Sequence, residues 1–236
     1  MCLKEGGILY GISVGPGDWE QMTLQAVRCI KASDVLLLPA ASREQCHAYG
    51  IAAKACPEIE NKEVRCYDFP MTRNREQLEQ SREGIYADIV EILQSGKSAA
   101  FLVIGDISIY STYSYMAEKA KRDGLRTVAV NGVTSFCACA GRLQIPLVSE
   151  EEDLHIFSGT ANLEEALKLP GTKVFMKLGK HLNKLKERLL PMVEAGTTRV
   201  FAVSYCGMEK EQIYFQLDEI PEQAGYLTTV IVKQVV

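Results

Sequence analysis

Short, nearly uninterrupted apolar runs alternate with helical segments through the first 130 residues of the chain. Residues 8–14, 35–38 and 99–104 form three such runs. An apolar run without alternation is typical of a strand buried on both faces, as in a parallel sheet covered by helices on both sides. Further strands are predicted at 64–67 and 127–130, and helices after Thr23, over 74–93 and over 111–121. The pattern predicts an α/β domain with a mainly parallel sheet over residues 1–130.

The second half of the chain has a different rhythm. Helices are predicted over 132–143 and 182–190, and strands over 155–157, 173–176, 199–204, 212–217 and 227–232. Strands that follow one another closely favour antiparallel pairing. We therefore predict a second, mixed α+β domain over residues 131–236. Because clefts between domains commonly hold ligands, we expect a ligand site in such a cleft.

The composition restricts the function classes. The chain has 236 residues, of which 47% are hydrophobic and 24% charged, so we expect one large or two small folded domains. No apolar run approaches the ~18 residues of a membrane span, and the first residues lack the apolar core of a signal peptide. We therefore expect a cytoplasmic protein. Its net charge of −4 argues weakly against a general nucleic-acid binder.

The cysteines do not form a metal-binding pattern. The chain has eight cysteines but no C-x-x-C pair, and only three histidines. Zinc and iron–sulfur sites need tighter clusters, so we predict no metal site. We interpret the cysteines as reduced thiols, several of them packed as small hydrophobic residues. Cys137 and Cys139, one residue apart in a helical stretch, are the pair expected to be redox-sensitive.

A glycine-rich segment over residues 11–18 follows the first predicted strand. It reads Gly-Ile-Ser-Val-Gly-Pro-Gly-Asp. A dinucleotide fingerprint needs G-x-G-x-x-G, but Ser13 stands at the middle glycine and Pro16 lies in the turn. An ATP-cradling G-x-x-x-x-G-K-[ST] motif is also missing from the sequence. The segment is either a structural turn or a loop that brings the backbone close to a ligand.

Other segments also carry groups suited to ligand binding. Asp106, after a buried strand, could accept hydrogen bonds from hydroxyl or ammonium groups, and the tyrosines and serines of 108–115 could bind an acidic ligand. The alternative is that Ser111 only caps a helix and the tyrosines only pack. Similarly, Thr134 and Ser135 either cap a helix or offer hydroxyls to a ligand, and residues 176–181 either line the same cleft or form an ordinary turn.

Together, in this order, the segments resemble the tetrapyrrole (corrin/porphyrin) methylase family of S-adenosylmethionine-dependent enzymes. The family loop is G-x-G-x-G-P-G-D followed by a T-L-x-A-V helix, and residues 15–18 and 23–27 match it. The runs 110–113 (Tyr-Ser-Thr-Tyr), 132–136 (Gly-Val-Thr-Ser-Phe) and 176–179 (Met-Lys-Leu-Gly) resemble the C-20 methyltransferase branch of the family. The sequence departs from the usual family residues at three positions: Ser13 replaces a glycine, and Ile107 and Asn131 each replace a proline. These changes loosen the turns in which they lie.

The resemblance implies a two-domain fold, usually a homodimer, that binds S-adenosylmethionine and releases S-adenosylhomocysteine. The implied reaction is methylation of carbon 20 of precorrin-2 or cobalt-factor II, a precorrin-2-type tetrapyrrole, in cobalamin biosynthesis. The family's cofactor contacts, carried over by position, are Pro16, Ile104, Gly105, Asp106, Ile109, Thr134, Ser135, Met176 and Gly207. The alternative is a methyltransferase of the same family that acts at another corrin position or on a non-tetrapyrrole acceptor.

A base must remove the proton from carbon 20 after the methyl group has been transferred. Asp18, Tyr110 and Tyr113 are the catalytic candidates, and the sequence does not choose among them. Basic candidates for the substrate carboxylates are Arg43, Arg73, Arg75, Lys177 and Lys180. Two further hypotheses are a nicotinamide-dependent oxidoreductase, which the missing fingerprint disfavours, and a non-catalytic tetrapyrrole carrier, which would not need the adenosyl cofactor.

Overall fold

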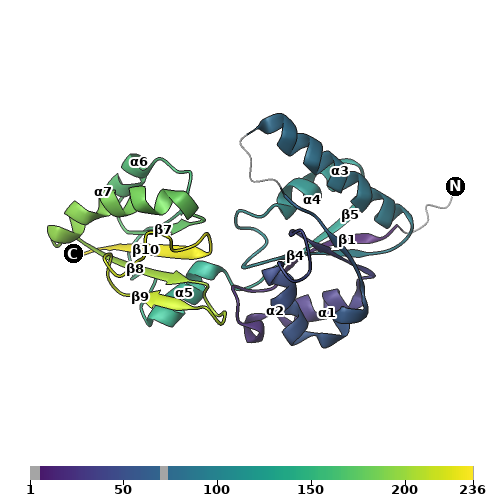
Figure 1. Cartoon of the computed structure of the whole chain (residues 1–236), viewed down its shortest axis with the longest axis horizontal. Coiled ribbons are helices and arrows are strands. Elements are labelled where there is room, and N and C mark those ends of the chain that lie inside the picture. Colours follow the sequence, from purple (N-terminus) through teal and green to yellow (C-terminus); the bar gives the residue numbers. More distant parts are fainter. Residues whose placement is uncertain (1–5, 70–73, 236) are drawn as a thin grey trace. The chain divides into compact units, whose positions relative to one another are not determined.

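The computed structural model describes residues 6–69 and 74–235. The chain forms two units, Met1–Thr134 and Ser135–Val236, each with its own five-stranded sheet and its own apolar core (Figure 1). The division follows Thr134, four residues after the position at which the sequence pattern places it. The described part of the chain contains no helix that is both long enough and apolar enough to cross a membrane.

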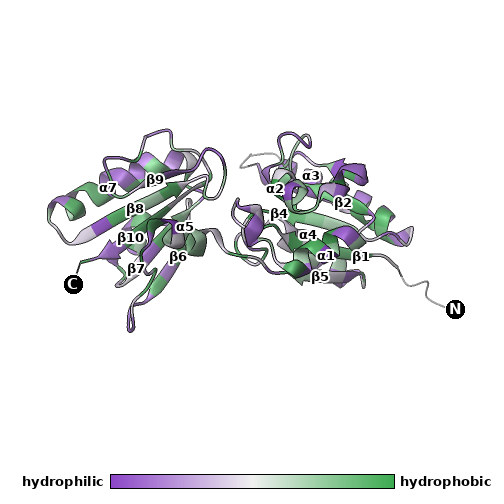
Figure 2. Ribbon diagram, turned by 90° about the horizontal axis from the view of Figure 1, so that it is seen from below, coloured by the Kyte–Doolittle hydropathy of each residue, from purple (hydrophilic) through white to green (hydrophobic). Residues whose placement is uncertain are grey.

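The sheet of the first unit is parallel throughout. Its strands are β1 (Ile8–Ser13), β2 (Val35–Leu38), β3 (Glu63–Cys66), β4 (Ala99–Val103) and β5 (Arg126–Val130). They lie in the order β3-β2-β4-β1-β5, and every neighbouring pair is parallel. The parallel sheet predicted from the apolar runs is confirmed. Figure 2 shows the apolar character of β4 as a largely green ribbon.

Helices cover both faces of this sheet. They are α1 (Leu24–Ala32), α2 (His47–Ala55), α3 (Arg75–Gln94) and α4 (Tyr113–Arg122), with short 3-10 helices η1 (Trp19–Gln21) and η2 (Pro57–Asn61). Helices α1 and α2 lie on one face and α3 and α4 on the other (Figure 1). Thr23 begins α1 as an N-cap, because its side chain accepts a hydrogen bond from the Ala26 amide at 3.1 Å. On the face covered by α3 and α4, Phe101 of β4 belongs to the same buried apolar cluster as Ile89 of α3 and Met116 of α4.

The strand order places a topological switch point between β4 and β1. The chain leaves β1 toward α1 on one face of the sheet, and it leaves β4 toward α4 on the other face (Figure 1). Loops that depart from neighbouring parallel strands in opposite directions open a crevice at the carboxyl ends of the strands, where α/β proteins bind ligands. Both glycine turns that the sequence analysis singled out lie at these two strand ends.

The second unit has a mixed sheet. Its strands are β6 (Leu154–Ser158), β7 (Thr172–Met176), β8 (Thr198–Ser204), β9 (Gln212–Tyr214) and β10 (Thr228–Gln234), in the order β6-β7-β10-β8-β9. Only the β6–β7 pair is parallel. The helices are α5 (Ser135–Leu143), α6 (Leu163–Lys168) and α7 (Leu182–Glu194), with η3 (Gly179–His181) before α7. Figure 1 shows α6 and α7 on one face of the sheet and α5 on the other.

Several predicted boundaries differ from the structure for identifiable reasons. The predicted helix over 132–143 begins only at Ser135, since the Gly132 amide donates to the Asp106 carboxylate instead of entering a helix. The predicted strand over 212–217 ends at Tyr214, because the Phe215 amide donates to the Glu219 carboxylate at 2.7 Å. The short helices α2 and α6 carry weak sequence signals and were not predicted.

Candidate functional site

Two glycine turns lie against each other at the ends of β1 and β4. The Gly105 amide donates to the Gly15 carbonyl at 2.8 Å, and the pair forms an isolated antiparallel bridge. Both glycines have left-handed backbones, with φ of 75° at Gly15 and 77° at Gly105. Because L-residues with a side chain rarely adopt this conformation, glycine is required for the two turns to meet. The sequence turns at 15–18 and 105–106 therefore form one structural feature.

Pro16 and Asp18 complete the first of these turns. Pro16 is buried. Asp18 is half-buried and caps η1, where its side chain accepts from the Glu20 amide at 3.0 Å. Gly11, earlier in the glycine-rich segment, has a different role: a Cβ atom there would lie 2.4 Å from the Tyr113 ring. This glycine makes room for a core side chain.

Asp106 is the most heavily hydrogen-bonded side chain of the candidate site. It is 6% exposed. One carboxylate oxygen accepts from the amide of Ser108 at 2.8 Å and from the hydroxyl of the same residue. The other accepts from the Gly132 amide at 2.8 Å and from the Asn131 side chain at 3.4 Å. Burial disfavours the charged carboxylate, but these donors outweigh it and lower the pKa of Asp106.

This bonding pattern is not among the features predicted from the sequence. The Asp106–Ser108 contact is an Asx turn, which the Asp-x-Ser spacing signals. The contact with Gly132 joins the end of β4 to the end of β5 and has no local sequence signal. Through these bonds Asp106 fixes the turn after β4 and the entry to the segment that contains Thr134.

Thr134 provides the observation that tests whether a ligand fits here. Its hydroxyl oxygen is buried and has no hydrogen-bond partner. A buried polar group without a partner is costly, and native structures usually satisfy it with a bound group or water. A Cβ atom on Gly132, two residues earlier, would lie 2.5 Å from the Ser13 Cβ atom and 2.9 Å from the Gly105 carbonyl oxygen, so the ends of β1, β4 and β5 meet closely. Close-packed backbone turns and an unsatisfied hydroxyl suit a small polar cofactor.

The tyrosines proposed as catalytic bases have contrasting positions. Tyr110 is 44% exposed and has a left-handed backbone with φ of 48°. Tyr113 is 3% exposed within the core, and its hydroxyl donates to the Leu9 and Val128 carbonyls at 3.3 Å and 3.2 Å. Burial raises the pKa of Tyr113 to about 12. A buried, neutral phenol that is bonded to main-chain carbonyls is suited to packing, which disfavours Tyr113 as the base.

Ile104, Ile109 and Ser135 are three further residues predicted to contact the cofactor. Each is half-buried. Ile104 follows β4 directly, and Ser135 is the first residue of α5. Their contact with a cofactor stays a prediction.

In the second unit, the predicted cofactor residues stand next to strained backbone. Met176 ends β7, and Lys177 after it has a left-handed φ of 54°. Gly207, with φ of 74°, lies two residues after Tyr205, whose φ is 52°. The left-handed conformation costs a residue with a Cβ roughly 1–2 kcal/mol, and such strain gathers at functional sites. Of the four described non-glycine residues with left-handed φ, Tyr110, Lys177 and Tyr205 adjoin predicted cofactor segments.

The candidate basic residues are not equivalent. Arg43 donates to the carbonyls of Glu60 and Lys62 at 3.3 Å and 3.2 Å, which is a structural role. Lys177 lies over the Tyr226 ring at 6.0 Å, and burial lowers the pKa of its ammonium group. Arg75 and Lys180 are exposed, at the start of α3 and in η3. Arg73 lies outside the described residues.

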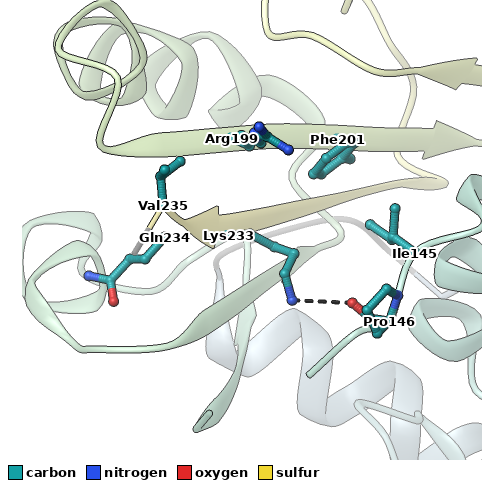
Figure 3. Close-up of a pocket in the computed structure, with 7 residues that line it drawn as sticks. All are labelled: Ile145, Pro146, Arg199, Phe201, Lys233, Gln234 and Val235. Carbon is teal, nitrogen blue, oxygen red and sulfur yellow. Dashed lines mark hydrogen bonds between the residues drawn. The ribbon is translucent and has the colours of Figure 1, made fainter. Parts of the chain in front are cut away.

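A separate hollow of about 350 Å³ lies in the second unit (Figure 3). It is lined by Ile145, Pro146, Arg199, Phe201, Lys233, Gln234 and Val235. The Lys233 ammonium group is already bonded to the Pro146 and Leu147 carbonyls at 3.2 Å and 3.0 Å and to the Glu152 carboxylate at 3.0 Å. This lysine of β10 therefore holds the sheet to the loop between α5 and β6. None of the predicted site residues lines the hollow.

The cysteines form no metal centre among the described residues, where no group of three or more potential ligands occurs. Cys137 is exposed and Cys139 is buried, so the two lie on different sides of α5. Cys139 instead forms a thiol hydrogen bond with Cys206, which lies next to Gly207. Cys139 therefore has Cys206, and not Cys137, as its thiol neighbour, and the redox sensitivity of these cysteines stays a prediction.

The parallel sheet and the paired glycine turns at its switch point define an α/β fold of the kind that binds ligands at the carboxyl ends of its strands. Residues 8–221 match the family model Tetrapyrrole (Corrin/Porphyrin) Methylases, and the chain belongs to this family. The resemblance inferred from the motifs is thereby confirmed.

Individual relatives agree with this assignment. The chain is 30% identical to the probable cobalt-precorrin-2 C(20)-methyltransferase of Methanocaldococcus jannaschii, over 96% of each chain. It is 28% identical to the cobalt-precorrin-2 C(20)-methyltransferase of Salmonella typhimurium, over 97% of each. Its fold is similar to that of uroporphyrin-III C-methyl transferase from Thermus thermophilus complexed with S-adenyl homocysteine. That match has a TM-score of 0.68 and 19% identity, and covers 96% of this chain and 97% of the other.

Proposed function

We propose that the chain is an S-adenosylmethionine-dependent C-methyltransferase that methylates carbon 20 of a precorrin-2-type tetrapyrrole in cobalamin biosynthesis. The substrate is precorrin-2 or its cobalt-loaded counterpart, cobalt-factor II. The observation that carries the proposal is the similarity to relatives named for this reaction over nearly the whole chain. The structure with S-adenosylhomocysteine of a protein of similar fold supports the choice of cofactor.

The proposed cofactor contacts follow from the family resemblance and suit the local structure. Pro16, Gly105, Asp106, Ile104, Ile109 and Thr134 are the proposed contacts in the first unit, and Ser135, Met176 and Gly207 those in the second. The unsatisfied Thr134 hydroxyl is a ready hydrogen-bond partner for a polar group of the cofactor. Asp106 acts mainly by holding the turns in place, because both its oxygens already accept hydrogen bonds from the chain.

The reaction needs little chemistry from the protein. S-adenosylmethionine supplies an electrophilic methyl group, and the enamine-like carbon 20 of the substrate is the nucleophile. The chain must hold the two reactants in line, and orientation of this kind can contribute several kcal/mol to a barrier. Asp18 and Tyr110 are the groups proposed to take the proton from carbon 20. Asp18 is half-buried at the end of the first glycine turn, and Tyr110 is exposed a few residues after the second.

The substrate carries many carboxylates, whereas the chain is net acidic. We propose that Lys177, Lys180 and Arg75 supply the local positive charge. We also propose that the enzyme is a cytoplasmic homodimer, as the family resemblance implies. Size-exclusion chromatography with light scattering tests the oligomeric state.

The decisive experiment is anaerobic incubation with methyl-labelled S-adenosylmethionine, with precorrin-2 and cobalt-factor II in parallel reactions. We expect label at carbon 20, located by NMR and mass spectrometry, and the faster reaction identifies the physiological substrate. A heat-denatured sample is the control. Cofactor binding without transfer to either substrate contradicts the proposed acceptor, and label at another ring position indicates a different member of the family.

A further inference from the structure

The main-chain amide of Ile107 is buried in the turn that follows β4. Ile107 is 3% exposed and packs in the core of the first unit. A buried amide without an acceptor destabilises a fold, so the turn needs a partner for this N–H group. The partner is the Ser13 hydroxyl, which accepts the hydrogen bond at 2.8 Å across 94 positions of sequence.

Ser13 is well placed to hold more than one turn. It is the last residue of β1 and is fully buried. A Cβ atom on Gly132 would lie 2.5 Å from the Ser13 Cβ atom and 2.9 Å from the Gly105 carbonyl oxygen. The serine side chain therefore lies against the segment after β5 and bonds to the turn after β4. Both of these segments bind the Asp106 carboxylate.

Ser13 and Ile107 supply an acceptor and its donor as a matched pair. Glycine at position 13 would remove the side-chain acceptor, and proline at position 107 would remove the N–H donor. Asn131, in the segment after β5, contributes a further donor to Asp106 at 3.4 Å.

We propose that Ser13 is a positioning residue of the cofactor site, which holds the turn over residues 105–107 in its binding geometry through the Ile107 amide. The proposal rests on the proposed function, because the turn matters for catalysis only if it contacts S-adenosylmethionine. Ser13 does not contact the cofactor in this proposal. It acts only through its hydrogen bond to the turn and takes no part in methyl transfer.

The test compares Ser13→Ala, Ser13→Gly, Ile107→Pro and the double variant Ser13→Gly/Ile107→Pro with the unmodified protein. The matched control is Ser33→Ala, which removes another buried serine hydroxyl whose bond, to the Cys29 carbonyl, is also 2.8 Å long. Calorimetry measures the Kd for S-adenosylhomocysteine, thermal unfolding gives Tm, and steady-state kinetics with the C-20 substrate separate kcat from KM for S-adenosylmethionine.

We expect Ser13→Ala to weaken S-adenosylhomocysteine binding about tenfold, the equivalent of one lost hydrogen bond to a buried donor. The KM for S-adenosylmethionine should rise more than kcat falls. The double variant should bind within about twofold of the unmodified protein, because it removes donor and acceptor together. Ser33→Ala should lower Tm while leaving the Kd within about twofold.

Three outcomes overturn the inference. In the first, Ser13→Ala lowers Tm but leaves the Kd unchanged, which makes Ser13 a purely structural residue. In the second, the double variant binds no better than the weaker single variant. In the third, Ser13→Ala and Ser13→Gly do not fold and the double variant does not fold either. If the unmodified protein itself does not bind S-adenosylhomocysteine, the proposed function fails, and hydrogen exchange at the Ile107 amide still reports whether Ser13 holds the turn.

Discussion

Each unit fixes one predicted cofactor segment with a carboxylate, but the two carboxylates differ in surroundings. In the first unit the Gly132 amide donates to Asp106, which is 6% exposed and has further donors on both oxygens. In the second unit the Gly207 amide donates to Glu211 at 2.5 Å, and Glu211 also pairs with Arg142 at 3.2 Å. The Glu211 side chain is 22% exposed and that of Arg142 is 40% exposed.

This difference determines how firmly each segment is held. Hydrogen bonds from a buried donor to a charged acceptor contribute about 1.5–3 kcal/mol, whereas an exposed ion pair contributes about 0–1 kcal/mol. The first unit therefore builds its turn as part of the core. The second unit holds its turn nearer the surface, where salt screens the ion pair.

The largest expected effect comes from Asp106→Ala. The substitution leaves the amides of Ser108 and Gly132, both in part-buried hydrogen bonds, without their acceptor, so we expect the free energy of unfolding to fall by about 3 kcal/mol. Affinity for S-adenosylhomocysteine should fall at least several-fold as the turns loosen. Urea unfolding and calorimetry measure the two effects. An unchanged affinity would show that this turn lies away from the cofactor.

The same residue predicts a pH dependence. The pKa of Asp106 is lowered in the folded protein, so its contribution to stability is complete above the unfolded pKa of about 4 and is lost as pH falls through the folded value. The stability difference between the unmodified protein and Asp106→Asn should therefore shrink below about pH 4. Urea unfolding at pH 7 and at pH 3.5 measures it. A difference that stays constant between these pH values contradicts the lowered pKa.

Tyr113→Phe should have an intermediate effect and shows whether the buried interior takes part in catalysis. The substitution removes a hydroxyl that bonds to two main-chain carbonyls, so we expect a loss of about 1 kcal/mol in unfolding free energy and unchanged kcat and KM. Tyr110→Phe, at a 44% exposed position, is the matched variant and should change turnover with little effect on stability. Lower turnover in Tyr113→Phe with unaltered stability would restore this residue as a catalytic candidate.

The sequence predicted local features of the first unit well. Turn chemistry places Gly15 and Gly105 after buried strands, and apolar runs identify the strands themselves. It did not predict the strand order, because β4 inserts between β2 and β1 through contacts about 65 to 90 positions apart in sequence. It also did not predict the core position of Tyr113, whose ring fills the space that the missing side chain of Gly11 leaves.

In the second unit the sequence located all five strands but not their pairing, because the strands do not lie in sequence order in the sheet. The last strand, β10, lies at the centre of its sheet between β7 and β8, so its position depends on the fold of everything before it. The strained residues Lys177 and Tyr205 have no sequence signal, since neither is a residue type that favours a left-handed backbone. The neighbouring Met176 and Gly207 are predicted as cofactor contacts from the family resemblance alone, and this assignment stays a prediction.

Glu211→Ala should have the smallest effect and sharpens the contrast with Asp106→Ala. The Gly207 turn is half-exposed, so water can replace the lost acceptor, and the expected loss of unfolding free energy is about 0.5–1 kcal/mol. The loss should shrink further when the salt concentration is raised from 0.05 M to about 0.5 M, because the Arg142 ion pair is screened, whereas the loss for Asp106→Ala should not change. Urea unfolding of both variants at the two salt concentrations measures this. Equal and salt-independent losses would show that the two carboxylates hold their segments with the same strength.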